Sequence, residues 1–142
     1  MTVRLNTDGI RYIGIFESLT GAEVKDCIID EEEQKVIMVV KKGCMGLAIG
    51  KKGINIKRVK EIIKKDIEVV EHSTDIKEFL ENLLHPACVK RVQILNNNNK
   101  LCAYVEVLPK HKGIAIGKNG RNIRKVKQII KRIQNIDNVI IK

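Results

Sequence analysis

The sequence is poor in aromatic residues, with no tryptophan, two tyrosines and two phenylalanines among 142 residues. This scarcity disfavours nucleic-acid-binding modules that stack bases on several aromatic rings, such as RNA recognition modules and OB-folds. The sequence also lacks a run of about 18 apolar residues, the minimum for a transmembrane helix, and an N-terminal apolar stretch typical of a signal peptide. We therefore expect a soluble, cytoplasmic protein with no membrane partner.

Cysteine and histidine are too scattered for a metal centre. The four cysteines are separated by 17, 44 and 14 residues, with no Cys-Xaa-Xaa-Cys motif and no histidine at ligand spacing. Three of them lie in predicted strands, which favours buried free thiols in a reducing compartment. We predict no metal site and no Cys/His or Ser/His nucleophile pair. The residues concerned are Cys27, Cys44, Cys88, Cys102, His72, His85 and His111.

A nucleotide-hydrolysing motif is also missing. A P-loop has four residues between its glycines, followed by Gly-Lys-Ser/Thr. The segment between Gly113 and Gly117 has three, and Asn119 stands where the magnesium-binding hydroxyl belongs. We therefore predict that the protein is not an enzyme, and that it has no cofactor and no small-molecule substrate.

What the sequence does contain is an internal repeat. The segment GLAIGKKGINIKRVKEIIK, which starts at Gly46, returns as GIAIGKNGRNIRKVKQIIK, which starts at Gly113, without a gap. Thirteen of the nineteen positions are identical. A Gly-Lys-Xaa-Gly loop that leads into a basic amphipathic helix has been duplicated, which indicates two copies of one structural unit.

Each copy is predicted to have the same order of elements. A helix opens each half, with Tyr12 aligned on Phe79 at the same 67-residue offset. Apolar runs on both sides of the loop and helix predict strands, and the polar segments 30–33 and 96–99 predict hairpin turns outside the strands. The strands are expected at 24–29, 36–40, 67–70, 89–95, 101–108 and 139–141.

The end of the repeat is less regular. The last strand departs from the offset by three or four residues, so the second copy is expected to have a longer helix or a longer connection there. We divide the chain into domains at residues 1–73 and 74–142. Asp75 is the expected cap of the helix that opens the second domain, with Ser73 or Thr74 as alternatives.

Positive charge indicates an anionic partner. The formal net charge is +10, and 18 of the 27 Lys and Arg residues lie in the segments 41–65 and 110–132, around the two loops. Residues 1–73 carry a net charge of +1 and residues 74–142 a net charge of +9. Such clusters attract polyphosphate ligands. Lys-rich helices can also be simply solvated, but repetition of loop and charge together favours binding.

The loops themselves have the features of a phosphate contact. Glycine has no Cβ and tolerates positive φ, so a sugar-phosphate backbone can approach the main chain closely. The helix that follows presents unpaired N–H groups and the positive end of its dipole. The alternative is that each glycine pair makes only a tight turn between helices. The candidate contacts are Gly50, Lys51, Lys52, Gly53, Arg58, Gly117, Lys118, Asn119, Gly120 and Arg121.

Here the chain resembles a known family. Ile49-Gly50-Lys51-Lys52-Gly53 and Ile116-Gly117-Lys118-Asn119-Gly120 resemble the GXXG signature of KH domains. The resemblance implies an α/β (α+β) fold of two tandem type II KH domains, each ordered helix-strand-strand-helix-helix-strand. Each three-stranded sheet is then mixed, because the crossover through two helices makes its last two strands parallel. Two such units in close tandem are similar to archaeal NusA-like transcription termination/antitermination factors.

That resemblance implies a function as well. A KH unit holds about four unstacked nucleotides of single-stranded RNA, here a nascent transcript or ribosomal RNA, with termination or antitermination of transcription as the process. Ile49, Ile54 and Ile116 are candidates for an aliphatic groove or for the core, and Asn55 and Asn122 either bond locally or reach RNA. The alternatives are a ribosome-assembly or rRNA-binding role, and an adaptor that docks on RNA polymerase.

Overall fold

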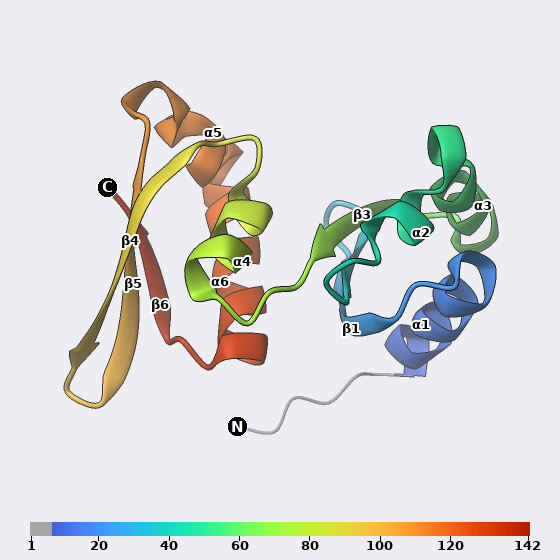
Figure 1. The fold of residues 1–142 in the computed structure, drawn as a ribbon, viewed down its shortest axis with the longest axis horizontal. Coiled ribbons are helices and arrows are strands. Elements are labelled where there is room, and N and C mark those ends of the chain that lie inside the picture. The colour runs from blue at the N-terminus through green and yellow to red at the C-terminus, as the bar shows by residue number, and fades with distance from the viewer. Residues whose placement is uncertain (1–6) are drawn as a thin grey trace. The chain divides into compact units, whose positions relative to one another are not determined.

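The computed structural model describes residues 7–142, which divide into two compact units between Ser73 and Thr74. Residues 1–6, which the predicted first domain includes, lie outside the described residues. In each unit a helix, two strands, two helices and a strand follow one another along the chain (Figure 1). The predicted order of elements is therefore confirmed in both copies. Within the described part of the chain, no helix has the length and apolarity needed to cross a bilayer.

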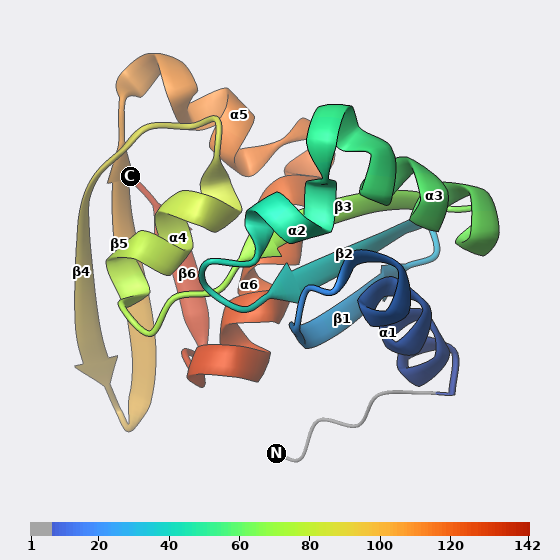
Figure 2. The ribbon, with the colours of Figure 1, turned by 45° about the vertical axis from the view of Figure 1, so that its right-hand side comes forward.

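The first unit is built on a three-stranded mixed sheet. Its central strand β2 pairs antiparallel with β1 and parallel with β3 (Figure 2). Val36 of β2 is paired with Ile29 on one side and with Ile67 on the other. This confirms the predicted parallel pair. The elements are α1 (Thr7–Thr20), β1 (Val24–Asp30), β2 (Lys35–Val40), α2 (Met45–Ile49), a 3-10 turn (Lys51–Gly53), α3 (Ile54–Ile63) and β3 (Asp66–Glu71).

The second unit repeats this plan. Its sheet has the order β4-β5-β6, with β4 and β5 antiparallel and β5 and β6 parallel. The first helix is capped by Asp75, whose side chain accepts a hydrogen bond of 3.1 Å from the Lys77 N–H. The elements are α4 (Ile76–Leu84), β4 (Val89–Asn97), β5 (Lys100–Val107), a 3-10 turn (Pro109–His111), α5 (Lys112–Ile116), a second 3-10 turn (Lys118–Gly120), α6 (Arg121–Gln134) and β6 (Asn138–Ile141).

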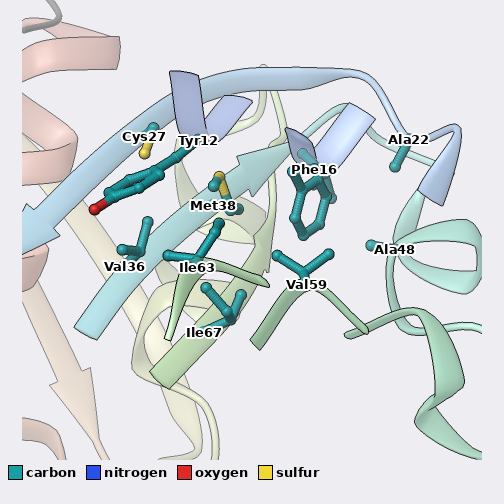
Figure 3. Close-up of a cluster of buried hydrophobic side chains, with 11 residues drawn as sticks. Tyr12, Phe16, Ala22, Cys27, Val36, Met38, Ala48, Val59, Ile63 and Ile67 are labelled. Atoms are coloured by element: carbon teal, nitrogen blue, oxygen red, sulfur yellow. The ribbon is translucent and has the colours of Figure 1, made fainter. Parts of the chain in front are cut away.

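The core of the first unit lies between the sheet and its helices (Figure 3). Residues four apart on a helix share one face, so Tyr12 and Phe16 of α1 and Val59 and Ile63 of α3 all point into this cluster. Val36, Met38 and Val40, which alternate along β2, fill its floor. Burying a large apolar side chain contributes about 1.5–3 kcal/mol. This packing holds α3, and therefore the start of α3 at the loop, on the sheet.

The broken offset at the end of the repeat comes from helix length. α3 has 10 residues and α6 has 14, so the second copy has one more turn of helix. The longer helix was one of the two expected explanations, and it is the one observed. Both helices end at a residue in the left-handed conformation, Lys64 and Asn135. From there Asp66 corresponds to Asp137 at an offset of 71 residues, and the paired residues of β3 and β6 correspond at an offset of 72 residues.

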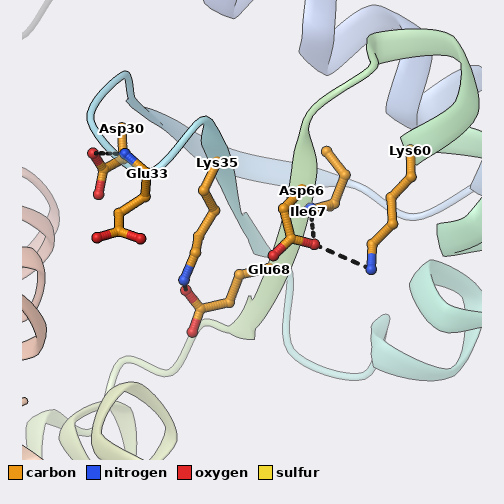
Figure 4. A network of polar contacts seen from close by, with 7 residues as sticks. All are labelled: Asp30, Glu33, Lys35, Lys60, Asp66, Ile67 and Glu68. Carbon is orange, nitrogen blue, oxygen red and sulfur yellow. Dashed lines mark hydrogen bonds and ion pairs between the residues drawn. The ribbon is translucent and has the colours of Figure 1, made fainter.

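An ion pair ties each basic helix to its last strand. Lys60 Nζ lies 3.2 Å from Asp66 Oδ1, which also accepts the Ile67 N–H at 3.1 Å (Figure 4). In the second unit Lys131 contacts Asp137, which accepts the Leu101 N–H at 2.9 Å. The hydrogen bond from the lysine is the main cause that lowers the pKa of each aspartate below its usual 3.8. Both copies therefore have the same Lys–Asp clamp, Lys60–Asp66 in the first and Lys131–Asp137 in the second.

Two expectations are corrected. Asn96 and Asn97 were expected in the turn but belong to β4, and only Asn98 and Asn99 connect the strands, with φ of 54° and 66°. Two consecutive residues of positive φ make the tight turn that suits a hairpin, and asparagine tolerates that conformation. Two rather than three cysteines lie in strands. Cys27 and Cys102 are buried, whereas Cys44 is half-buried and Cys88 is exposed.

Candidate nucleic-acid interface

The two GXXG loops have the same backbone conformation. Gly50 and Gly117 have φ of 75° and 78° with ψ of 171° and 168°. Lys52 and Asn119 have φ of 56° and 57°, and Gly53 and Gly120 have φ of 75° and 72°. No corresponding pair differs by more than 3° in these angles. The duplicated sequence therefore makes the same loop twice, between a five-residue helix and the basic helix.

An asparagine from the next helix packs against the first glycine of each loop. Asn55 Nδ2 donates to the Leu47 carbonyl at 2.7 Å, and Asn122 Nδ2 donates to the Ala115 carbonyl at 2.8 Å. A Cβ on Gly50 would lie 2.7 Å from Asn55 Cγ, closer than atoms can approach. Of the two roles considered for the asparagines, local bonding is the one observed. They brace the loop against the preceding helix.

The second glycine starts the basic helix. Gly53 and Gly120 are the N-cap residues of α3 and α6 and have no side chain to accept from the first helical turn. The N–H groups of that turn carry the positive end of the helix dipole. All four loop glycines are partly exposed. An anion therefore has access to the main chain at both places.

The charged candidates surround these helix starts. Lys51, Lys52 and Lys118 lie within the loops and are exposed, and Arg121 is the first residue of α6 and is also exposed. Asn119 is exposed at the position of Lys52. Arg58 lies further along α3, in its second turn, and is exposed. The structure thus gathers the predicted residues into two separate sets, one in each unit, with Arg58 at the margin of the first.

An apolar rim accompanies each loop. Ile49 is 37% exposed, Ile54 46% and Ile116 39%, so these three side chains lie at the surface beside the loops and not in the core. Sequence reasoning missed two further members of this rim, Leu47 at 52% and Ile114 at 48% exposed. Their alignment at the same position of the repeat was the available signal. Exposed aliphatic side chains next to an anion-accessible helix start suit a ligand with both phosphates and apolar surfaces.

The histidines and cysteines do not gather into a metal site in the described part of the chain. Among residues 7–142, no three His, Cys, Asp or Glu side chains come together as metal ligands. His72 follows β3, and burial, followed by the charge of Lys25, lowers its pKa. His111 Nδ1 accepts the Cys88 N–H at 2.9 Å. His72 thus lies in the linker, and His111, in the 3-10 turn before α5, binds the residue that precedes β4.

The fold and the paired GXXG loops define a tandem KH protein. The model of the KH domain matches residues 10–74, and the model of the NusA-like second KH domain matches residues 76–140. Together they span most of the chain. The chain therefore belongs to the family of NusA-like tandem KH proteins, as its similarity to named relatives also shows.

Those relatives match the chain from end to end. The probable transcription termination protein NusA of Methanococcus vannielii is 37% identical over 139 residues, which cover 98% of this chain and 79% of that protein. The protein of the same name from Halobacterium salinarum is 34% identical over 139 residues, 98% of each. The crystal structure of APE1850 matches with a TM-score of 0.87 and 33% identity, and covers 97% of this chain and 100% of that one.

Proposed function

We propose that this protein binds single-stranded RNA through both GXXG loops and acts in transcription termination or antitermination. The observation that supports this most is that the two loops have the same backbone conformation, each with accessible glycines at the start of a basic helix. The relatives named as probable transcription termination proteins support the process. The role assigned is binding and positioning of RNA, with no catalytic step.

The loops act on the RNA backbone. A phosphate accepts hydrogen bonds from the main-chain N–H groups at the start of α3 or α6, where the helix dipole favours negative charge. Lys51 and Lys52 in the first loop, and Lys118 and Arg121 in the second, neutralise neighbouring phosphates. The bases lie against the aliphatic rim, which includes Leu47 in the first unit. A KH unit holds about four unstacked nucleotides in this way.

A titration with fluorescent single-stranded RNA of about eight nucleotides, the combined span of two KH units, tests the proposal. Lys51→Asp/Lys52→Asp and Lys118→Asp/Asn119→Asp should each weaken binding by about tenfold or more, because each replaces attraction to phosphate by repulsion. Combining them should cost more than the sum of the two, because a strand held at two places gains from an effective concentration.

The matched control is Lys25→Asp/Lys77→Asp. It removes at least as much positive charge as either loop variant, from β1 and α4, which carry no part of the loops. It should weaken binding far less than the loop variants. Equal losses for control and loop variants, or equally tight binding of double-stranded RNA, would contradict a specific role of the loops. An adaptor for RNA polymerase would be indifferent to the RNA in every variant.

The RNA partner in the cell separates the remaining alternatives. Crosslinking of the protein to RNA in cells, followed by sequencing, should recover nascent transcripts, with enrichment near their 3′ ends. Loss of crosslinks in the variant with both loops changed is the control for specific recovery. Recovery of ribosomal RNA alone would replace transcription by a ribosome-assembly role while leaving the loop mechanism intact.

A further inference from the structure

One aromatic ring lies outside the core. The chain has four aromatic residues, all of them described, and Tyr12, Phe16 and Phe79 are buried. Tyr104 is only half-buried, in the middle of β5. Its neighbours Ala103 and Val105 point into the core and are fully buried, so Tyr104 points to the opposite face of the sheet. Figure 2 shows that α4 and α6, within this unit, both lie on the core side.

The ring borders a depression on that outer face. The depression is open, has a volume of about 480 Å³, and is lined in part by Asn97, Lys100, Tyr104, Asn138 and Ile140. Sites for small ligands have volumes of about 300–1,000 Å³. Ile140 pairs with Tyr104 across the strands and is 38% exposed. The depression thus joins an aromatic ring, an aliphatic side chain and two amides.

The charge of this surface is positive. Lys142 Nζ lies over the Tyr104 ring, 5.3 Å from its centroid, and Lys100 is exposed on the rim. The one carboxylate of the lining, Asp137, is already engaged by Lys131 and by the Leu101 N–H. Two lysines beside an accessible ring therefore suit an anionic ligand with a flat apolar part.

The first unit lacks these features. Ile37 occupies the position of Tyr104 and Glu33 that of Lys100, at the 67-residue offset. In the last strand Glu68 pairs with Ile37 and Ile140 with Tyr104, so the copies correspond there at an offset of 72 residues, and the buried Val70 occupies the position of Lys142. The first unit thus has an aliphatic side chain in place of the ring, an acidic residue in place of Lys100 and a valine in place of Lys142. The surface is therefore a property of the second unit and not of the repeated architecture.

We propose that the outer face of the β4-β5-β6 sheet is a second contact for single-stranded RNA, with an unpaired base stacked on Tyr104. The base takes the place of the Lys142 ammonium over the ring, Lys100 and Lys142 bind the adjoining phosphates, and the amides of Asn97 and Asn138 contact the edge of the base. Stacking on an aromatic ring is tolerant of base identity, and lysines beside it track the backbone. This inference rests on the proposed binding of RNA, but it uses none of the loop residues.

The experiment follows backbone amide signals by NMR while RNA of about eight nucleotides, the span of two KH units, is added. It uses the whole chain and the variant Lys51→Asp/Lys52→Asp/Lys118→Asp/Asn119→Asp, whose loops should no longer bind. The amides of Asn97, Tyr104 and Asn138 should shift in both proteins. Tyr104→Leu should weaken this contact by about tenfold, whereas Tyr104→Phe should retain it, because the ring provides the stacking.

Several outcomes overturn the proposal. If these amides do not shift in the unaltered chain while the loop amides do, the outer face binds no RNA and the loop function stands. If Tyr104→Leu binds as well as Tyr104→Phe, stacking is not the interaction. If polyglutamate of equal charge produces the same shifts, the surface is a general anion site that fits an acidic protein segment. Lys100→Glu, which introduces the residue of the first unit, should reduce the RNA-dependent shifts, and unchanged shifts would also contradict the proposal.

Discussion

The two glycines of each loop are required for different reasons. Gly50 combines φ of 75° with ψ of 171°, a region open essentially to glycine alone, and has the Asn55 side chain against its Cα. Gly53 has the left-handed helical conformation, and a Cβ there would meet only Ile56 Cγ2 at an ordinary 3.8 Å. The first glycine is thus irreplaceable, whereas the second can be exchanged for a residue that tolerates positive φ.

A pair of substitutions tests this difference. Gly50→Ala should lower the free energy of unfolding by about 2–3 kcal/mol, because it adds both backbone strain and a steric clash. Gly53→Asn should change it by no more than about 0.5 kcal/mol, because asparagine adopts the left-handed conformation readily. Urea denaturation of both variants measures the two effects. Equal destabilisation would show that the loop does not have the described conformation.

The third position of the loop is Lys52 in the first copy and Asn119 in the second. The two residues differ in charge and in the energetic cost of a left-handed backbone conformation. Lys52 and Asn119 have the same left-handed conformation, which is costly for lysine and easy for asparagine. Lys52→Asn should therefore stabilise the first unit by up to about 1 kcal/mol and weaken RNA binding severalfold, since a phosphate partner is lost. Asn119→Lys should do the reverse in the second unit.

Thermal denaturation and RNA titration of the two exchanges, measured side by side, check this prediction. Lys51→Asn is the control, because it removes the same charge from the neighbouring loop position, which is not among the residues of positive φ. It should weaken binding without stabilising the fold. If stability and affinity change in the same direction in Lys52→Asn, strain at this position is not the cause.

Individual side chains were harder to place from the sequence than the loops. The glycines and lysines of the repeat were identified because their pattern is local. The hydrogen bonds of Asn55 and Asn122 depend on how the short preceding helix folds back, and the exposure of Leu47 and Ile114 depends on which face of that helix the sheet covers. In the sequence Tyr104 was counted only as one of four aromatic residues, because its position outside the core is visible only in the structure.

Among the elements, the two basic helices show how the copies diverged. α6 is one turn longer than α3, yet each helix ends in a left-handed residue and each is tied to its last strand by a Lys–Asp pair. An insertion of a whole turn preserves the face that a helix presents to the sheet. The insertion has therefore lengthened the basic surface without disturbing the core or the clamp.

The clamp predicts how stability depends on acidity. The pKa values of Asp66 and Asp137 are lowered in the folded protein, so the unfolded chain binds protons more readily. Their contribution is complete above the unfolded value of about 4 and is lost as the pH falls through the lower folded values. Asp66→Asn/Asp137→Asn should therefore lose less stability than the unaltered chain between about pH 6 and pH 3.

Urea denaturation at both pH values measures this difference. Both pairs are partly exposed to solvent, so the effect should be small and should shrink further at high salt. Asp30→Asn is the control, since its carboxylate accepts the Glu33 N–H in the hairpin turn and lies outside both Lys–Asp pairs. An acid-induced loss that is as large in the double variant as in the unaltered chain would contradict a stabilising role for the clamp.

The order of elements was predictable from the repeat, while their ends were not. The apolar runs located all six strands, and the crossover through two helices required β2 and β3, and β5 and β6, to be parallel. The polar run of asparagines gave no sign that two of them continue β4. Backbone pairing in an exposed hairpin is set by the turn conformation of Asn98 and Asn99, and not by side-chain polarity.

For the whole molecule, duplication gives two equal loops on two units of unequal charge. The net charge is +1 for residues 1–73 and +9 for residues 74–142, although the neighbourhoods of the loops are similarly basic. The difference lies in acidic residues elsewhere in the first unit, such as Glu31 to Glu33 in its hairpin turn. Long-range attraction should thus bring RNA mainly to the second unit, and the loops then decide how it is held.

The dependence of affinity on RNA length measures whether both loops hold one strand. Single-stranded RNAs from about four nucleotides, the span of one KH unit, to several times that length are titrated against the unaltered chain and Lys118→Asp/Asn119→Asp. The affinity of the unaltered chain should rise by about a hundredfold over the series, because the second contact becomes intramolecular. The affinity of the variant should rise only slightly with length, because a longer RNA offers one loop more equivalent positions to bind. The same steep rise in both proteins would contradict joint binding by the two loops.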